Sequence, residues 1–475
     1  MRVLVTGAET PEGLAVIRAL AQAGIDVVAA GDRRLSMGFA SRYPRARLRY
    51  TPVSVSPRRA AEDIVDIIDR TNPDLVVPVG EDLLVTLNET RRRVTRHTIL
   101  AAPPAEVLGR ALDRAKTLTL VRHLGIPTPK WVQGESLTEV LEGAEQLRFP
   151  VSIQPRGPGL YRPIAHTLDF SVRYAESLGA LARMLGPLQR DLRMLLIQEC
   201  LTGVGHCVSA VCDQGQVVAL FPCEWEREFP LTGGVSVVRR SIPLDPRLES
   251  ITRRVLEAWA WHGVAMVEFR YDRRDDEYTF VGVSTRFPTS TALALEAGIN
   301  LPHLAACLYT GKQLPAVRPH RVGVRERWLR GDLLALRDGL SRPKPRAPAQ
   351  VPYARTTSFS LWGTFLKDLF RMAWSSEFRF SDPGPALVEL GGLTRLIGGW
   401  IRDGVGGSLK QFGSWALTPR VPPLELKRQP PLPVQPREER VVPSGFEVGE
   451  KVGVVGFEEH PRPGSGEFAL SGREG

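Results

Sequence analysis

The sequence predicts an α/β protein with an open sheet near its N-terminus, an α+β region in the middle and a disordered C-terminal tail. Three observations predict this. Short apolar runs alternate with helical periods over residues 2–78, as in open α/β sheets. Strand patterns then dominate between residues 149 and 280. From residue 419 onward the chain is too rich in proline and polar residues to fold alone.

The N-terminal region shows the alternation most clearly. The expected elements are strands at 2–7, 25–29 and 73–78 and helices at 11–24 and 60–70. The segment TGAETPEG (6–13) follows the first strand and resembles a dinucleotide-binding fingerprint, but it lacks the middle glycine. We therefore interpret this segment as a tight turn.

The middle region begins with a helical pattern at 106–124. Gly125 caps this helix, and Pro127 and Pro129 force an extended chain after it. Further on, the patterns favour strands at 197–210, 217–222 and 266–271 and an amphipathic helix at 248–261.

The C-terminal region differs in character. A proline-rich linker is expected at 341–352. Residues 358–374 form a helical pattern with an apolar stripe at Trp362, Phe365, Leu366, Leu369 and Ala373. A helix packed on the main body is the preferred interpretation. Contact of residues 358–415 with a membrane surface is the alternative, because aromatic and basic residues occur together there.

Composition restricts the compartment and the partners. The net charge is +10 and the isoelectric point is about 9.6, but the basic residues are scattered arginines without a nucleic-acid motif. We expect a solvated basic surface and no nucleic-acid partner. Five cysteines without a CxxC pair predict reduced thiols rather than zinc. The first residues read as a strand, and no apolar run reaches membrane-spanning length, so the predicted location is cytoplasmic.

Six segments follow one another in an order that is typical of one superfamily. They are Asp113-Arg114 with GIPTP (125–129), FPVSIQPRGPG (149–159), IQECLTG (197–203), FPLTGG (229–234) followed by Arg239, HGVAMVEF (262–269), and FVGVSTRFPTSTALALEAGINLP (280–302). Together they resemble the ATP-grasp superfamily, especially its carboxylate–amine ligase and carbamoyl-phosphate-synthetase-like branch. The resemblance covers about residues 1–320.

The resemblance implies a domain order. It places a Rossmann-like pre-ATP-grasp domain at 1–108 and an ATP-grasp domain at 109–325, whose two lobes clamp ATP. A helical extension with the proline-rich linker is then expected at 326–415 and the disordered tail at 416–475. The resemblance also makes a homodimer possible.

The reaction that the resemblance implies uses ATP to phosphorylate a carboxylate, and an amine then attacks the acyl phosphate. Such chemistry needs cations on the β- and γ-phosphates and, in the family, magnesium held by hard oxygen ligands. The implied cofactors are ATP and magnesium, and the implied substrate is a small molecule with carboxylate and amine groups. Nothing in the sequence selects which one.

The phosphate and adenine positions are carried over from the family motifs. Arg114 replaces the first phosphate-binding lysine, and arginine can bind phosphate. The second cation falls on Gln154, which has no charge; Arg156 and Arg162 are the nearest replacements. The adenine-binding hinge falls on Gln198, Glu199 and Leu201.

The catalytic and metal positions are only partly retained. Arg286 falls where the family places an arginine for the transferring phosphate, and Arg239, after FPLTGG, is the second candidate catalytic residue. Glu268 is the first metal ligand. The second ligand, a glutamate, is replaced by Gly282, and an asparagine ligand is replaced by Ser284. The acidic residues in DRRDDEY (272–278) are interpreted as an exposed hairpin turn.

Two functional hypotheses remain open. In one, the chain is an ATP-dependent ligase; in the other, it is a catalytically inactive ATP-grasp homologue that acts as a binding or regulatory protein. Each residue also has a structural alternative: Glu268 can pair with an arginine, and Gln198 and Glu199 can be ordinary strand residues.

Overall fold

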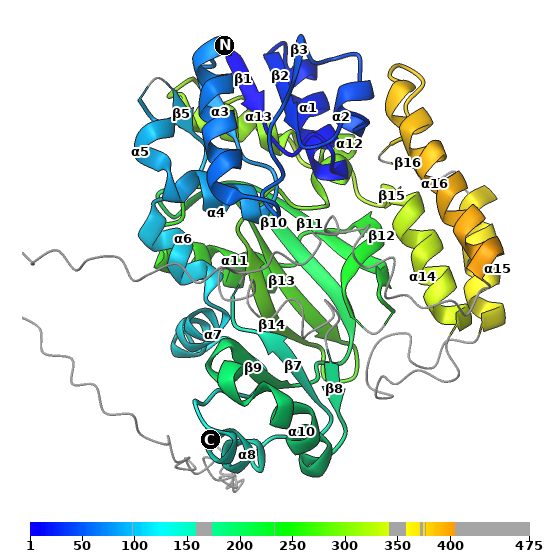
Figure 1. Ribbon diagram of the computed structural model, residues 1–475. Helices are drawn as coiled ribbons and strands as arrows, with labels where there is room; N and C mark the ends of the chain where they lie inside the picture. Colours follow the sequence, from blue (N-terminus) through cyan, green and yellow to red (C-terminus); the bar gives the residue numbers. More distant parts are fainter. Residues whose placement is uncertain are drawn as a thin grey trace, which may run out of the picture. The chain divides into compact units, whose positions relative to one another are not determined.

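A parallel five-stranded sheet forms the N-terminal part of the chain in this computed structural model (Figure 1). Its strands, in the order β3-β2-β1-β4-β5, are β1 (Arg2–Val5), β2 (Asp26–Gly31), β3 (Ala46–Arg49), β4 (Leu75–Val77) and β5 (Ile99–Leu100). The helices are α1 (Pro11–Gln22), α2 (Met37–Ala40), α3 (Pro57–Thr71), α4 (Glu81–Glu89) and α5 (Arg91–Val94). The predicted α/β class is confirmed here.

The structure describes residues 1–96, 98–157, 173–231, 233–341, 358–370, 374–375 and 377–403. Residues 342–352 of the predicted proline-rich linker, the tail at 416–475 and Arg162 lie outside these ranges. The domain boundaries stay predictions.

The turn after β1 is built around Gly7 and the cap of α1. Gly7 has a φ of +72°, and a Cβ there would lie 2.4 Å from the carbonyl oxygen of Val79. The side chain of Thr10 accepts a hydrogen bond from the N–H of Gly13 and so caps α1, and Pro11 follows without an N–H. The segment is therefore a tight turn with a capped helix, as the sequence predicts.

The single helix expected at 106–124 is wrong. The chain forms α6 (Ala105–Leu112) and α7 (Arg114–His123), separated by Asp113 in an extended conformation. The Asp113 carboxylate accepts hydrogen bonds from the backbone N–H groups of Ala115 and Lys116. Because aspartate favours this N-cap role, it starts a new helix inside the helical pattern.

A second, four-stranded sheet has the order β6-β9-β7-β8. Its strands are β6 (Trp131–Val132), β7 (Val151–Pro155), β8 (Arg173–Ala175) and β9 (Leu195–Glu199). One face packs against α8 (Leu137–Ala144), α10 (Leu178–Leu185) and η1 (Gly186–Met194) through an apolar cluster that includes Ile153 and Ile197. The other face carries the polar side chains of the candidate site.

The third sheet has seven strands in the order β14-β13-β10-β11-β12-β15-β16. They are β10 (Val204–Asp213), β11 (Gln216–Phe229), β12 (Val235–Ser241), β13 (Gly263–Asp272), β14 (Glu277–Ser284), β15 (Arg325–Arg327) and β16 (Trp374–Ser375). The strand expected at 197–210 is divided into β9 and β10. Gly203 separates them with a φ of +97°, and a Cβ there would lie 2.2 Å from the oxygen of Tyr271.

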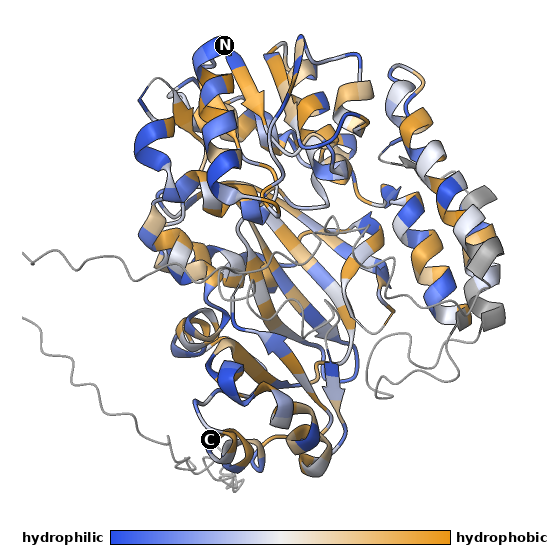
Figure 2. Cartoon of the chain, in the orientation of Figure 1, coloured by the Kyte–Doolittle hydropathy of each residue, from blue (hydrophilic) through white to orange (hydrophobic). Residues whose placement is uncertain are grey.

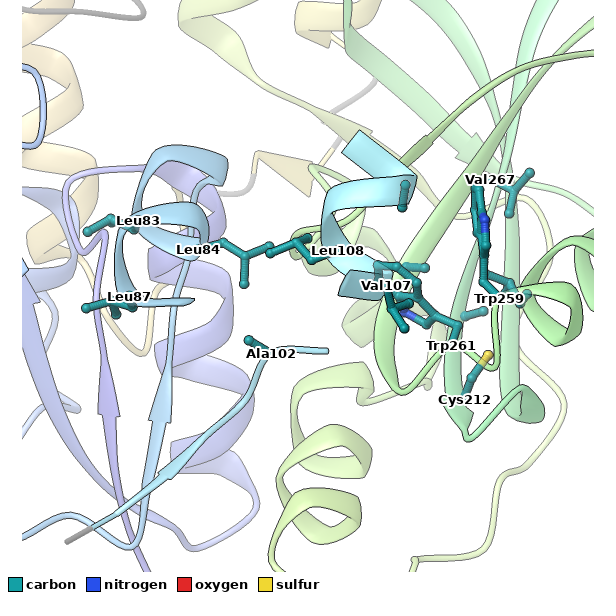
Figure 3. Packing of buried hydrophobic residues seen from close by; sticks show 14 of the residues in the cluster. Leu83, Leu84, Leu87, Ala102, Val107, Leu108, Cys212, Trp259, Trp261 and Val267 are labelled. Carbon is teal, nitrogen blue, oxygen red and sulfur yellow. The ribbon is translucent and has the colours of Figure 1, made fainter. Parts of the chain in front are cut away.

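The core extends from the first sheet to the seven-stranded sheet. Figure 3 shows Leu84 of α4 beside Leu108 of α6, and Val107 of α6 beside Trp261. These residues belong to one buried cluster that also includes Val267 of β13. The helix α11 (Pro246–Ala258) covers the same face of the sheet. The opposite face packs against α12 (Thr291–Ala297) and α13 (Leu301–Tyr309).

Helices α14 (Leu329–Ser341), α15 (Ser358–Phe370) and α16 (Gly384–Asp403) form the C-terminal extension. Phe365 of α15 belongs to one buried cluster with Val238 of β12, and Asp368 of α15 binds Arg227 of β11 at 2.7 Å, so α15 does contact the main body. The Asp382 carboxylate accepts hydrogen bonds from Arg18 at 2.9 Å and from Ser41 at 2.8 Å. These contacts attach the extension to the N-terminal sheet domain.

Within the described ranges, no single helix is long and apolar enough to cross a membrane. The pair α12 and α13, bent by 101°, passes that test only by length and composition, and both helices bury most of their side chains. The five cysteines are free thiols.

Candidate functional site

Glu268 lies in β13 of the seven-stranded sheet, next to its antiparallel neighbour β14. The register places Gly282 of β14 directly opposite Glu268, and Ser284 opposite Met266. Paired residues project to the same face of a sheet, so the three positions that the family uses for metal do come together. A Cβ added to Gly282 would meet no atom within 4 Å, which leaves room for a side chain there.

The residues present do not fit a magnesium site of the family kind. Glu268 supplies one carboxylate, Gly282 supplies no side-chain oxygen, and Ser284 supplies a neutral hydroxyl. No group of three histidine, cysteine, aspartate or glutamate side chains suited to a metal occurs among the described residues. One carboxylate with a hydroxyl is a poor ligand set for this hard cation.

The acidic run after β13 does not supply the missing ligands. Asp272 accepts hydrogen bonds from Thr202 at 2.6 Å and from Arg274, and Asp276 binds Arg247. These residues lie in the hairpin between β13 and β14, at the opposite end of the strand pair from Ser284. The hairpin interpretation of this run is confirmed.

The positive charges of three arginines act on the carboxylate of Glu268. Arg114, Arg286 and Arg270 each favour its ionised form, yet burial outweighs them and raises the pKa of Glu268 above its usual range. The structural alternative for Glu268, an association with arginine, therefore has support. Arg270 was not expected from the sequence, although a residue two positions from Glu268 must project to the same face.

Arg114 and Arg286 reach this place from different elements. Arg114 begins α7, is partly buried, and donates to the carbonyl oxygen of Val281 at 3.3 Å. Burial lowers the pKa of Arg114, and the attraction of Glu268 opposes that effect. Arg286 follows β14 and lies 3.5 Å from a carboxylate oxygen of Glu12.

Two helices that follow strands of the five-stranded sheet contribute carboxylates to the site. Glu12 lies in the first turn of α1 and Glu81 in the first turn of α4, directly after the adjacent parallel strands β1 and β4. Burial raises the pKa of Glu81, and the attraction of Arg286 opposes it. No local pattern predicts these contacts, because they join segments that are distant in the sequence.

Several arginines of the region are already paired with carboxylates of the chain. Arg239 lies 3.0 Å from Glu326 in a buried pair, and β10 and β11 separate its strand from β13. Arg270 donates to both oxygens of Glu228, at 2.5 and 2.7 Å. The structure thus brings Arg114 and Arg286 close to Glu268 and leaves Arg239 apart from it.

Gln154 occupies the predicted place on β7. Its side chain donates to the Ser152 hydroxyl at 3.0 Å, and its strand partner is Leu196. The suggested replacement cation, Arg156, instead binds both oxygens of Asp113, at 2.9 and 2.8 Å. This pair lowers the pKa of Asp113 although burial opposes it.

The predicted adenine hinge is divided between two faces of β9. Gln198 pairs with Ser152 and so shares the face of Gln154, whereas Glu199 pairs with Val151 on the other face and accepts the backbone N–H of Arg148 at 2.9 Å. Leu201 follows in the connection to β10. The Gln198 Oε1 and Trp131 Nε1 atoms are buried without a hydrogen-bond partner. Neighbouring unpaired polar atoms suit a polar ligand such as a purine base.

No family model matches the chain. In sequence it is similar to the large chain of carbamoyl phosphate synthase from Methanosphaerula palustris, at 25% identity over 280 residues, which are 56% of this chain and 25% of that protein. It is also 24% identical over 279 residues to the N-terminal section of the same enzyme chain from Methanopyrus kandleri, and the match covers 55% of this chain and 48% of that protein. The chain spans about a quarter to a half of these relatives.

Solved structures show the same fold. A biotin carboxylase from Campylobacter jejuni, described as a β,γ-ATP complex, matches 68% of this chain and 74% of its own with a TM-score of 0.55 at 14% identity. A biotin carboxylase domain dimer from Hydrogenobacter thermophilus with MgADP matches 68% and 73%, with a TM-score of 0.55 at 16% identity.

An L-amino acid ligase from Bacillus licheniformis matches 66% of this chain and 75% of its own, with a TM-score of 0.50 at 14% identity. Together with the sequence relatives, these neighbours confirm the resemblance drawn from the six motifs. The chain therefore has the ATP-grasp fold of these neighbours and resembles carboxylate–amine ligase-like relatives in sequence.

Proposed function

We propose that this protein binds ATP between the lobes of its ATP-grasp fold and does not use it for magnesium-dependent acyl phosphate formation. In this proposal the protein acts as a binding or regulatory member of its family. The observation that carries the proposal is Gly282, which faces Glu268 across the β13–β14 pair where a second carboxylate is needed.

The cations support the same proposal. A phosphoryl group in transfer needs positive charge held in line with the attacking and leaving oxygens. At the end of β7 the neutral Gln154 stands in the place of a cation, and the adjacent Arg156 is bound to Asp113. Arg286 faces the carboxylate of Glu12. Much of the charge that would hold the phosphates is therefore balanced within the chain.

ATP binding itself has separate support. Arg114 remains near Glu268, and the unpaired Gln198 and Trp131 atoms lie on one face of the four-stranded sheet. Neighbours with this fold are described with ATP analogues or MgADP. The Hydrogenobacter neighbour is described as a dimer, which supports the prediction of a homodimer.

A second candidate function is an ATP-dependent ligase that joins a carboxylate to an amine. The observation that favours it is the retained trio of Glu268, Arg114 and Arg286, which the fold brings together from three elements. In that function the two arginines would stabilise the negative charge of the transferring phosphate. The step would have to proceed without the usual metal ligands.

The test is a calorimetric titration of the full chain with ATP, in magnesium and in EDTA, together with an assay for ADP release. We expect affinities that agree within about threefold, since one charge-assisted contact changes affinity by more than that. We also expect no ADP release with carboxylate and amine substrates.

The variant Gly282→Glu with Ser284→Asn restores the family ligand types and should make ATP binding stronger in magnesium than in EDTA. Gly282→Ala with Ser284→Ala is the control, because it changes the same two positions without supplying an oxygen ligand at either. Tight, magnesium-dependent binding by the natural chain would contradict the proposal. So would the absence of any ATP binding, which would contradict the ligase function as well.

A further inference from the structure

The described part of the C-terminal extension buries its acidic side chains. Asp368, Glu377, Asp382 and Glu389 are each less than 5% exposed. Asp368 binds Arg227 at 2.7 Å and Arg325 at 3.0 Å, and Asp382 binds Arg18. These four acidic side chains are therefore buried inside the protein, and two of them, Asp368 and Asp382, bind arginines of the main body.

The outward side chains of the same segment are apolar or basic. Lys367 and Arg395 are exposed. The exposed large apolar residues, which we call the extension patch, are Trp362, Leu366, Phe378, Phe380, Leu387, Leu390 and Ile397. Phe380 is 99% exposed and Leu387 is 68% exposed. Exposed aromatic and aliphatic side chains gathered on one short segment indicate an interaction surface.

Helix α16 has two apolar stripes rather than one. Ala386, Leu393 and Leu396 are buried, and the two leucines pack near Leu334 of α14. Leu387, Leu390 and Ile397, which are spaced by three and seven residues and so lie along one side of a helix, are exposed. Figure 2 shows apolar residues along much of α16. Packing within the chain requires only the first stripe, so the second stripe is available to another surface.

We propose that the extension patch docks on an anionic lipid surface. Helices that lie in a membrane interface combine apolar and aromatic side chains with lysine and arginine, and anionic headgroups attract such basic residues. Because the acidic side chains of the segment point inward, nothing described on its outer side repels a negative surface. The net charge of +10 adds long-range attraction.

A second copy of this chain fits the patch less well. A twofold contact brings the same surface of each copy together. Lys367 and Arg395 would then face like charges, and no described acidic side chain of the extension is exposed to pair with them. The charge pattern therefore favours lipid over self-association.

The experiment is flotation of the full chain with phosphatidylcholine vesicles, with and without phosphatidylserine. We expect the protein to float with the vesicles that contain phosphatidylserine and to dissociate as salt increases. Absence of binding to either vesicle type would overturn the proposal. Equal binding to both types would also overturn it, because the charge pattern would then play no part.

Matched variants locate the contact. Leu387→Ser with Ile397→Ser should reduce vesicle affinity by about tenfold or more, through lost apolar burial. Lys367→Gln with Arg395→Gln should reduce it by about fivefold for each charge. Leu35→Ser is the control, because Leu35 is 69% exposed but lies in the loop after β2, and it should bind like the natural chain.

Analytical ultracentrifugation of the same variants measures their oligomeric state. It distinguishes a lipid surface from a second copy of this chain as the partner of the extension patch. If the Leu387→Ser and Ile397→Ser changes dissociate an oligomer and leave vesicle binding unchanged, a second copy covers the patch and the proposal fails. If they abolish vesicle binding and leave the oligomeric state unchanged, the proposal is supported.

Discussion

Glu9 shows how one buried carboxyl group can make folding depend on pH. It lies in the turn after β1 and accepts hydrogen bonds from the backbone N–H of Asp32 at 3.2 Å and from the Tyr50 hydroxyl at 3.3 Å. Burial, followed by repulsion from Asp32, raises the pKa of Glu9 to about 7. The folded chain therefore keeps a proton that the unfolded chain has already lost.

The raised pKa of Glu9 fixes the direction in which the free energy of unfolding changes with pH. Between the ordinary value of 4.5 and about 7, the folded state binds more protons, so the free energy of unfolding decreases as the pH rises through this range. Glu9→Gln should reduce that decrease by about 1–2 kcal/mol. Urea unfolding between pH 5 and 8 measures it. Glu62→Gln, at a surface carboxylate paired with Arg58, should leave the pH dependence of the free energy of unfolding unchanged. If Glu9→Gln also left it unchanged, the raised pKa of Glu9 would be contradicted.

At this scale the sequence predicted the positions of the site residues but not their contacts. Motif spacing placed Gly282 and Ser284 beside Glu268 because a hairpin register is local. Glu12, Glu81 and Glu228 were missed, since their contacts with Arg286 and Arg270 depend on how separate elements pack. The pairing of Arg156 with Asp113 was also not visible in the sequence.

At the scale of elements, periodicity predicted where regular structure occurs but not where it breaks. Asp113 divides a helical pattern because its carboxylate caps α7, and Gly203 divides a strand pattern because the backbone of Tyr271 approaches it closely. Both breaks depend on single residues inside an unbroken apolar pattern. Such a pattern contains no information about a cap or a close approach.

The attachment of the extension can be tested at the same scale. Arg18 and Asp382 form a buried pair, with side chains 2% and 1% exposed. Arg18→Met should cost about 3–5 kcal/mol, because Asp382 is left buried and unpaired. Arg18→Met with Asp382→Asn should cost less, because no unpaired charge remains.

Urea unfolding and proteolysis within residues 377–403 report the loss. The control is Arg58→Met in the exposed pair with Glu62, for which we expect less than about 1 kcal/mol. Equal costs for Arg18→Met and Arg58→Met would show that the buried pair does not hold the extension.

At the scale of the whole molecule, the fold class was predictable because each of the six motifs is local. The full extent of the seven-stranded sheet could not be predicted from local patterns. Its last strand, β16, pairs with β15, although more than 40 residues separate the two strands in the sequence. The shared core of α4, α6 and β13 was likewise outside the reach of local patterns.

Nucleotide binding should stabilise the whole molecule independently of magnesium. ATP at about 100 times its dissociation constant should raise the free energy of unfolding by about 2.7 kcal/mol, equally in magnesium and in EDTA. Arg114→Gln should weaken binding about tenfold by removing a charged contact and so halve the effect at the same ATP concentration. Arg110→Gln, at the half-exposed neighbour, is the control. Thermal unfolding measures the effect, and a shift seen only with magnesium would contradict the expectation.

The pairing of Arg18 with Asp382 also requires a delay during synthesis on the ribosome, because the pair cannot form until both residues have been made. The two residues are 364 positions apart, so at about 5–20 residues per second Asp382 is made about 20–70 s after Arg18. During that interval the N-terminal sheet domain has a guanidinium that is destined for burial but lacks its final partner. The five-stranded sheet and its helices therefore complete their buried contacts only after residue 382 has been made.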